Sequence, residues 1–324
     1  MTIDSQLNKI PTEKDAEHIL EKVLQEKVKK IKRFPTGTEH YVYDLTTQSN
    51  KELVVRIGRE DARRIFSGAL YWHSILKPRG VPLPELLFSE INKNLFDFPV
   101  MIMERLKGHD LGKVYPQLTS DQKRKLAQDI YAIQNSVASL PNGKGFGFAT
   151  SYEDNSLKKS WHSLLENQLE RTKTRIREAN LFDIEYYNKI ASLIDENKDY
   201  FLKVKPVGFL DDTTTKNVII NEGKLAGIVD TDYVCFGDPL FVVALTQMGL
   251  LSEGYDTDYI SNWTDLLRIT PHQYKVLTLY TIMHCVGFMS ELGGAFNRMK
   301  PKEVSKQETQ QLIDIFEKLV HSFA

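Results

Sequence analysis

The chain has 324 residues, of which 41% are hydrophobic and 26% are charged, a composition typical of a folded globular protein. This length is enough for two packed lobes. The net charge is −1, so the chain has no overall field that would attract nucleic acid or an anionic membrane surface. We therefore expect neither nucleic acid nor a membrane among its partners.

Two further features bear on where the protein works. Cys235 and Cys285 are its only cysteines, and they form neither a metal-binding spacing nor a disulfide framework. Residues 1–5 (MTIDS) have no basic start and no apolar run, so we expect no signal peptide. No apolar stretch approaches the ~20 residues of a membrane helix. These features favour a cytoplasmic protein.

The first third of the chain is predicted to form a small sheet with two helices. Thr12 is a good N-cap for the first helix, because Glu13 and Asp15 follow in its first turn. The basic run over residues 27–33 is interpreted as a solvated helix end leading into a strand, rather than as a nucleic-acid patch. A long helix is predicted over residues 60–77. A strand–turn–strand unit and further strands are predicted over residues 34–45, 53–57, 83–88 and 98–103.

The remainder of the chain is predicted to be mainly helical. From Ser120 onwards, Leu126, Ile130, Ile133 and Val137 recur at helical spacing. Two charged amphipathic helices and then two strongly apolar helices are predicted over residues 158–181, 183–202, 242–251 and 274–288.

These elements predict an α+β fold with two lobes. Residues 1–105 are expected to form a small lobe with a mostly antiparallel sheet, and residues 106–324 a larger, mainly helical lobe. His284 and Cys285 fall within the last apolar helix, where a core histidine and a core thiol are favoured over a pair of metal ligands.

The strongest functional signal is residues 209–217 (FLDDTTTKN), followed by residues 228–230 (IVD). Asp212 precedes Asn217 by five residues, and Asp230 ends the next apolar run. Phosphoryl transfer needs a carboxylate that orients the attacking hydroxyl, and oxygen ligands that hold Mg²⁺ against the phosphates. Asp212 can serve as the base. Asn217 and Asp230 can serve as the metal ligands.

A β-hairpin is predicted to bring these groups together. Residues 217–221 and 225–229 have the apolar content of strands, and residues 222–224 (EGK) supply a turn. Asp230 can therefore return to the vicinity of Asn217 despite their separation in sequence. An Asp–Asn pair at this spacing would, alone, be more typical of a surface loop.

These residues resemble the aminoglycoside phosphotransferase-like kinase family, relatives of choline kinases and protein kinases. The catalytic loop of that family reads H-G-D-x-x-x-x-N, followed by a hairpin, a metal-binding Asp and G-D-P. Asp212, Asn217, Asp230 and residues 237–239 (GDP) match these positions. Upstream, residues 98–108 (FPVMIMERLKG) resemble the segment that links the two lobes of the family, and further matches occur over residues 80–84, 137–140 and 145–147. The resemblance covers about residues 12–250 and implies a bilobal, protein-kinase-like fold.

Three positions depart from the family pattern. Its His and Gly before the catalytic Asp are Leu210 and Asp211 here, so the brace that the His provides is missing. Its usual Lys on the third strand is Arg56, whose fork can grip phosphate oxygens. The following helix has no Glu to pair with that cation, and Glu60, just before the helix, is the nearest candidate.

The resemblance implies that ATP or GTP binds with Mg²⁺ in the cleft between the lobes. It places one loop over the phosphates, Arg56 beside them, and the backbone of residues 103–106 against the base. The implied nucleotide-binding residues are Gly37, Thr38, Arg56, Met103, Glu104, Arg105 and Ile219.

Two functions from different classes follow. The first is an ATP- or GTP-dependent kinase that phosphorylates a hydroxyl of a small molecule, such as an aminoglycoside antibiotic, a sugar or an amino alcohol, acting as a monomer or homodimer. A cationic acceptor would need carboxylates, which Glu253, Asp256 and Asp258 could supply, although a short acidic loop is commonly just solvated. The second is a catalytically weak, nucleotide-binding regulatory protein. Protein phosphorylation is disfavoured, because the segment from Asp230 to Pro239 is too short to dock a peptide.

Overall fold

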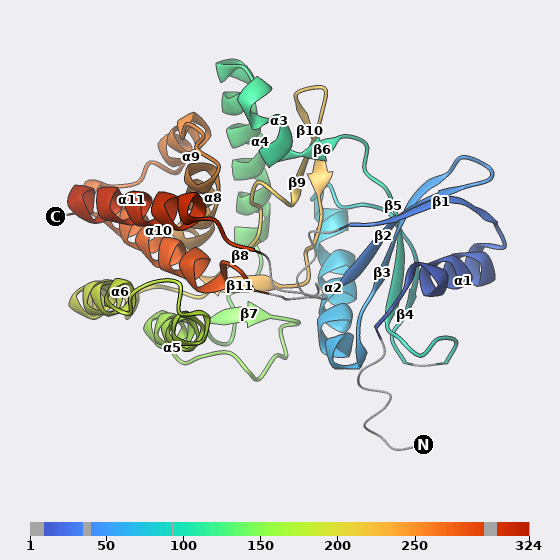
Figure 1. Cartoon of the computed structure of the whole chain (residues 1–324), viewed down its shortest axis with the longest axis horizontal. Coiled ribbons are helices and arrows are strands. Elements are labelled where there is room, and N and C mark those ends of the chain that lie inside the picture. Colours follow the sequence, from blue (N-terminus) through green and yellow to red (C-terminus); the bar gives the residue numbers. More distant parts are fainter. Residues whose placement is uncertain (1–9, 35–39, 93, 295–302, 324) are drawn as a thin grey trace.

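The structure is a computed structural model that describes residues 10–34, 40–92, 94–294 and 303–323. It contains a small lobe built on a five-stranded antiparallel sheet and a larger helical lobe (Figure 1). The strand order in the sheet is β1-β2-β3-β5-β4. The predicted division into an antiparallel-sheet lobe and a mainly helical lobe is confirmed.

The small lobe follows the predicted order of elements. Helix α1 begins after Thr12, whose side chain forms a reciprocal capping box with Asp15. The small-lobe strands and helices are α1 (Glu13–Leu24), β1 (Val28–Arg33), β2 (Tyr41–Thr47), β3 (Glu52–Ile57), α2 (Arg63–Leu76), β4 (Leu86–Glu90) and β5 (Val100–Glu104).

Two predictions in this lobe need correction. The basic run is a strand, β1, rather than the end of a helix, because α1 stops at Leu24 and Gln25 takes a left-handed conformation with φ 56°. Val28 and Ile31 then pack against the core of the sheet while the lysines between them stay exposed. Strand β4 begins at Leu86 rather than at residue 83, since Pro82 and Pro84 precede it and cannot donate to a ladder.

The large lobe packs its helices around one extensive apolar core. Helices α8 and α10 are buried on most faces, as their continuous apolar sequences predict. Two helices in the C-terminal part of the chain, α9 and α11, were not predicted from the sequence. The helices of this lobe are α3 (Leu111–Val114), α4 (Ser120–Ala138), α5 (Trp161–Ala179), α6 (Glu185–Glu196), α7 (Lys198–Phe201), α8 (Leu240–Ser252), α9 (Asp258–Leu267), α10 (Pro271–Glu291) and α11 (Lys306–Phe323).

Two small sheets lie where the lobes meet. One has the order β10-β9-β6 and contains the predicted hairpin, and the other has the order β7-β11-β8. Their strands are β6 (His109–Asp110), β7 (Gly147–Ala149), β8 (Val207–Phe209), β9 (Val218–Asn221), β10 (Lys224–Ile228) and β11 (Val234–Gly237).

Helix α2 lies between the sheet and the helical lobe (Figure 1). One of its faces packs on the sheet through Phe66 and Ala69. The other face belongs to the core of the large lobe through Trp72 and Leu76, and the Trp72 indole N–H donates to the Ala149 carbonyl oxygen at 2.6 Å. The helix therefore joins the two lobes as well as supporting the sheet.

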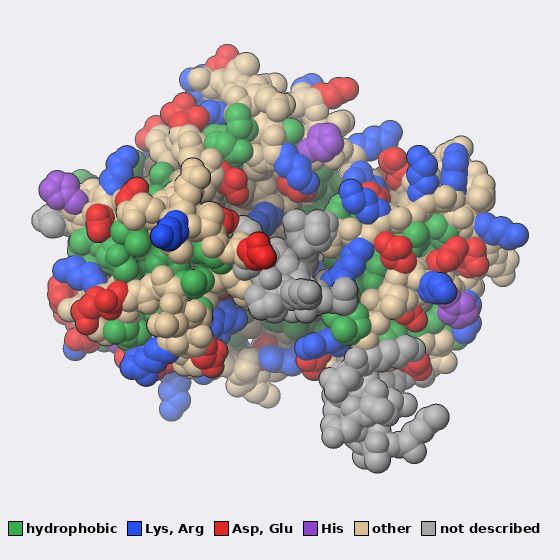
Figure 2. Space-filling view, viewed as in Figure 1, with side chains coloured by type: hydrophobic (Ala, Val, Ile, Leu, Met, Phe, Trp, Pro, Cys, Tyr) green, Lys and Arg blue, Asp and Glu red, His purple; other side chains and the backbone are tan. Residues whose placement is uncertain are grey.

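The surface shows no single dominant charge on the face in Figure 2, where acidic and basic side chains are interspersed. Within the described ranges, no helix is long and apolar enough to cross a bilayer. The His284 Nε2–H donates to the Phe241 carbonyl oxygen at 3.1 Å, and Cys285 is fully buried, with its thiol 3.4 Å from the Leu312 carbonyl oxygen. Cys285 is a core residue, as predicted, and His284 is part-buried beside Phe241.

The linker between the lobes passes very close to β9 at Gly108. Its φ is +118°, and a Cβ atom there would lie 2.2 Å from the Ile220 carbonyl oxygen. We expect Gly108→Ala to lower the free energy of unfolding by about 3 kcal/mol, because backbone strain and a backbone clash add. Gly254→Ala is the matched control: φ is +73° but nothing lies within 4 Å, so about 1 kcal/mol of strain is expected. Urea unfolding measures both, and equal losses would contradict this explanation.

Burial lowers the pKa of His284 to about 4, so the folded protein keeps this imidazole neutral. The unfolded chain takes up a proton near the ordinary pKa of about 6.5, and stability should fall as the pH drops from about 6.5 to 4. We expect this group to account for about 2–3 kcal/mol of that loss. His284→Gln keeps a donor for Phe241 but cannot titrate, so its unfolding free energy should depend less on pH. Identical profiles by urea unfolding would contradict the assignment.

Candidate active site

The loop between β8 and β9 holds its own shape around the predicted base. The Asn217 side-chain amide donates to the Asp212 carbonyl oxygen at 3.2 Å, and the Asn217 N–H donates to the Thr214 carbonyl oxygen at 3.2 Å. The Thr214 hydroxyl donates to Asp212 Oδ1 at 2.6 Å. The spacing of Asp212 and Asn217 therefore reflects a closed turn that orients the Asp212 carboxylate.

A buried glutamine from α4 supplies the brace that the sequence left unassigned. Gln134 Oε1 accepts from the Leu210 N–H at 2.9 Å, and Gln134 Nε2 donates to the Leu210 carbonyl oxygen at 2.9 Å and to the Thr213 hydroxyl at 3.0 Å. Both peptide groups of the residue that replaces the family His are thus satisfied from outside the loop. Sequence reasoning missed Gln134, because helical periodicity only placed it beside core residues.

The hairpin brings Asp230 back to Asn217 as predicted. Val218 pairs with Ile228, and the Val229 N–H donates to the Asn217 carbonyl oxygen at 2.9 Å. Asp230 then turns out of the strand with φ +62°, in the left-handed region that Asp tolerates better than most residues. The turn leaves the Asp230 carboxylate 49% exposed at the lobe junction.

The donor set at this position suits Mg²⁺. The cation prefers oxygen ligands, and in phosphoryl-transfer sites it takes one or two carboxylates together with phosphate oxygens and water. Asp230 offers a carboxylate and Asn217 an amide oxygen. Within the described part of the chain, no group of three or more His, Cys, Asp or Glu residues could enclose a metal on its own. The residues therefore fit a metal that is shared with a nucleotide.

Arg56 lies at the centre of an ion-pair network that spans the lobes. Its guanidinium forms a fork with Asp232, Nη1 to Oδ1 at 2.9 Å and Nη2 to Oδ2 at 2.8 Å. Nη2 also donates to Asp230 Oδ1 at 2.9 Å. His40 Nε2 lies 3.0 Å from Asp232 Oδ2. Sequence reasoning missed Asp232 and His40, and the only available signal was a second Asp two residues after Asp230.

The pKa values of the site carboxylates are shifted first by burial and then by the charges of their neighbours. Burial raises the pKa of Asp212, and burial and the Asp212 charge raise the pKa of Asp211 well above its usual range. Desolvation in the cleft and the Asp232 charge raise the pKa of Asp230 to about 6. Burial would also raise the pKa of Asp232, but the Arg56 charge and the His40 contact outweigh it and hold that pKa well below its usual range.

The predicted nucleotide-binding residues are placed in part. Gly37, Thr38 and the Glu60 side chain lie outside the described part of the structure. Ile219 is buried on β9, and Met103 on β5 lines a small cavity of about 30 Å³ together with Arg56 and Asp230.

The linker between the lobes leaves few peptide groups for a base. The Glu104 N–H donates to the Glu85 carbonyl oxygen at 2.9 Å, and the Arg105 N–H donates to the Glu52 carbonyl oxygen at 3.2 Å. Contact with a base through the N–H groups of residues 104 and 105 is therefore blocked. Only carbonyl oxygens and the next N–H along the chain remain for that role.

Asp238 is a buried acidic residue that stabilises the fold near the active site. Asp238 accepts hydrogen bonds from the Leu240 N–H at 3.0 Å and from the hydroxyls of Tyr200 and Tyr280 at 2.9 and 3.0 Å, so it braces the start of α8.

The acidic loop after α8 is tied to α4. Asp256 Oδ2 accepts from Lys123 Nζ at 2.6 Å and Asp256 Oδ1 from the Tyr115 hydroxyl at 3.0 Å. Its carboxylate is therefore engaged within the protein, although its side chain stays 49% exposed.

Comparison with known proteins identifies the family of this chain. The family model described as "Phosphotransferase enzyme family" matches residues 30–275. The chain belongs to the phosphotransferase enzyme family. Among curated proteins, no sequence relative matches this phosphotransferase.

Several solved structures share the fold of the phosphotransferase. A thermostable mutant of aminoglycoside phosphotransferase APH(4)-Ia aligns with a TM-score of 0.67 at 16% identity, covering 95% of this chain and 99% of that one. Aminoglycoside 2'-phosphotransferase-IIIa with GDP gives 0.65 at 11% identity, with 94% and 96% covered. A fructosamine-3-kinase-like protein from Thermobifida fusca gives 0.62 at 11% identity, with 94% and 98% covered. The predicted family and protein-kinase-like fold are confirmed, and so is the prediction of a phosphotransferase.

The brace on the catalytic loop can be tested without a known acceptor. Gln134→Leu keeps the volume but leaves the Leu210 N–H and carbonyl groups buried without partners, which we expect to cost about 2–4 kcal/mol of stability. Deuterium uptake of the peptide that spans residues 207–217 should rise more than uptake elsewhere. Gln134→Glu, which keeps the acceptor for the Leu210 N–H, should show a smaller rise. Unchanged exchange in Gln134→Leu would contradict the bracing role.

Proposed function

We propose that the phosphotransferase moves the γ-phosphoryl group of ATP or GTP to a hydroxyl of a small molecule, with Mg²⁺ as cofactor. The observation that carries this proposal is the convergence of Asp212, Asn217 and Asp230 beside Arg56 at the lobe junction. Residues 1–105 would form the nucleotide lobe, and residues 106–324 the catalytic and acceptor lobe.

Each residue has a distinct role in this proposal. Asp212 orients the acceptor hydroxyl and takes up its proton, a role that suits a carboxylate whose pKa is raised towards neutrality. Arg56 neutralises phosphate charge. Asn217 and Asp230 would hold Mg²⁺, which when bound neutralises charge on the β- and γ-phosphates. Positioning and electrostatics supply most of the rate gain in such sites, about 3–4 kcal/mol for a single well-placed donor.

The donor and acceptor classes rest on the structural relatives. Aminoglycoside phosphotransferase APH(4)-Ia has been solved with AMP-PNP and hygromycin B, and 2'-phosphotransferase-IIIa with GDP. These titles support both ATP and GTP as candidate donors. The proposed acceptor is an aminoglycoside, a sugar or an amino alcohol. The shape of the acceptor pocket in the helical lobe decides which of them binds.

A regulatory, catalytically weak nucleotide-binding protein is the second candidate. It is favoured by two departures from the family pattern: Arg56 stands in place of the usual Lys, and the helix that follows it carries no Glu. Turnover separates the two functions, because a regulatory protein should bind nucleotide without consuming it.

The proposal predicts a Mg²⁺-dependent nucleotide site. ATP or GTP at ~100 times its dissociation constant should stabilise the protein by ~2.7 kcal/mol, a shift of several degrees in Tm. Asp230→Asn should lose the Mg²⁺-dependent part of the shift. Asp212→Ala should keep the shift but reduce turnover by at least about 100-fold with any acceptor that the wild type phosphorylates. The absence of any shift, or normal turnover in Asp212→Ala, would contradict the proposal.

A further inference from the structure

Helix α2 offers no carboxylate to the phosphate-binding cation. Its sequence, residues 63–76 (RRIFSGALYWHSIL), contains neither Asp nor Glu. The groups that it presents to Arg56 are the Phe66 ring, with its centroid 5.5 Å from the guanidinium carbon, and Ala69, which lines the small cavity beside Arg56. The counter-ion of Arg56 must therefore come from another element.

That counter-ion comes from the large lobe. Asp232 lies between β10 and β11, and its carboxylate meets the guanidinium as a two-bond fork at 2.8 and 2.9 Å. Each of the two side chains is 8% exposed. A bidentate, buried Arg–carboxylate pair fixes both the position and the plane of the guanidinium, which a single contact does not.

Asp232 is itself held at two points, its carboxylate and its backbone. His40 Nε2 contacts its Oδ2 at 3.0 Å from the start of β2. Helix α2 packs directly on the backbone: a Cβ atom at Gly68 would lie 2.8 Å from the Asp232 carbonyl oxygen and 2.9 Å from Thr150. Only glycine allows this approach.

We propose that Asp232 is the positioning residue for Arg56, so that a carboxylate of the large lobe sets the cation that grips the nucleotide phosphates. The inference rests on the proposed function and adds a residue to it. Arg56 belongs to the sheet and Asp232 to the large lobe, so the cation takes its place only when the two lobes are docked.

The shared nitrogen of Arg56 gives Asp232 a second role. Nη2 lies 2.8 Å from Asp232 and 2.9 Å from Asp230. Asp232 accepts from both terminal nitrogens of the guanidinium, whereas Asp230 accepts from Nη2 through Oδ1. Without Asp232, Arg56 would keep its contact with Asp230 and compete more strongly with Mg²⁺ for that carboxylate.

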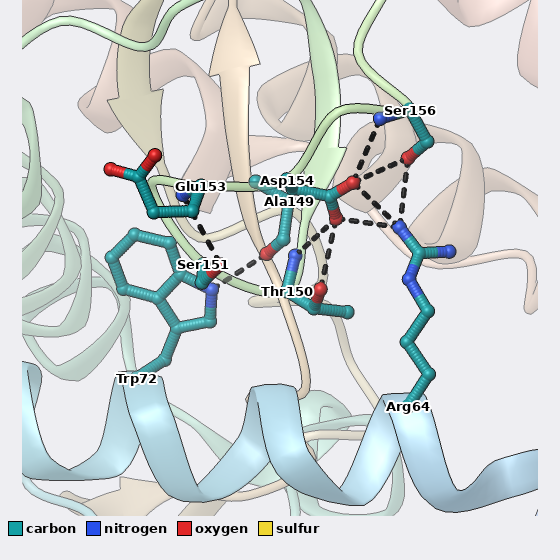
Figure 3. Close-up of polar contacts among 8 residues, drawn as sticks. All are labelled: Arg64, Trp72, Ala149, Thr150, Ser151, Glu153, Asp154 and Ser156. Carbon is teal, nitrogen blue, oxygen red and sulfur yellow. Dashed lines mark hydrogen bonds and ion pairs between the residues drawn. The ribbon is translucent and has the colours of Figure 1, made fainter.

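A second ion pair, between Arg64 of α2 and Asp154, serves as the control (Figure 3). Arg64 of α2 donates to both oxygens of Asp154 at 2.7 Å, and Asp154 also accepts from the Thr150 and Ser156 N–H groups. The Asp154 side chain is 2% exposed. This pair also joins α2 to the large lobe, although Arg64 is 60% exposed, and its contacts reach neither Arg56 nor Asp230.

The test compares Asp232→Asn with Asp154→Asn in the full-length protein. Calorimetric titration with Mg·ATP and Mg·GTP gives the dissociation constant and its dependence on Mg²⁺ concentration. With an acceptor in hand, steady-state kinetics adds the KM of nucleotide and of acceptor. Asp232→Asn should weaken nucleotide binding at least 10-fold and raise the Mg²⁺ needed for half-saturation, with the acceptor KM within about 2-fold. Asp154→Asn should lower Tm and leave nucleotide and Mg²⁺ dependence unchanged.

A relocated carboxylate provides the rescue. Ala69→Glu in the Asp232→Asn background places a carboxylate on α2 facing Arg56, and should recover part of the nucleotide affinity. Should Asp232→Asn not fold, Arg56→Gln probes the same pair, and its nucleotide affinity should fall at least 10-fold. A wild type that binds nucleotide while Asp232→Asn binds it equally well would overturn the inference alone. Equal binding by Arg56→Gln would overturn the inference and also the phosphate-binding role of Arg56. A wild type without nucleotide binding would overturn the proposed function and the inference with it.

Discussion

The arrangement of the two lobes around the cleft depends on one buried, bidentate ion pair between Arg56 and Asp232. Neither group is stable alone at such a depth, because an unpaired charge in a low-dielectric interior costs several kcal/mol. Arg56 is fixed in the sheet by its ladder position opposite Met101. Asp232 is fixed by the packing of α2 on its backbone. Pairing them therefore constrains how the sheet sits on the helical lobe.

Helix α2 supplies the apolar counterpart of that constraint. Phe66 belongs to the core under the sheet, whereas Trp72 belongs to the core of the large lobe. Burial of a large aromatic side chain contributes about 2–3 kcal/mol, and the indole N–H is satisfied by the Ala149 carbonyl oxygen. A helix that is part of both cores resists movement relative to either lobe, which keeps the polar network in register.

The active site concentrates negative charge. Asp230 and Asp232 contact Arg56, and Asp211 and Asp212 lie near enough for these carboxylates to affect one another. Burial is the main cause of the raised pKa of Asp211, Asp212 and Asp230, and the charge of a neighbouring carboxylate adds to it. Such a site gains when a divalent cation enters, since the cation relieves repulsion between the carboxylates while it neutralises phosphate charge. The same crowding explains why the catalytic loop needs a firm brace, which Gln134 provides through both peptide groups of Leu210.

The sequence by itself determined the family, the two-lobed fold and the order of Asp212, Asn217 and Asp230, because these depend on local spacing and on a hairpin whose turn residues are explicit. The sequence did not predict contacts between side chains of elements that are far apart along the chain. Gln134 is 76 residues from Leu210, and Asp232 is 176 residues from Arg56, so no local pattern marks either contact. It also took a basic strand for a helix end, because alternation with lysines is weak over six residues. Tertiary structure decided which residues brace the loop and neutralise the cation, since buried polar groups take whatever partners the packing brings within hydrogen-bond distance.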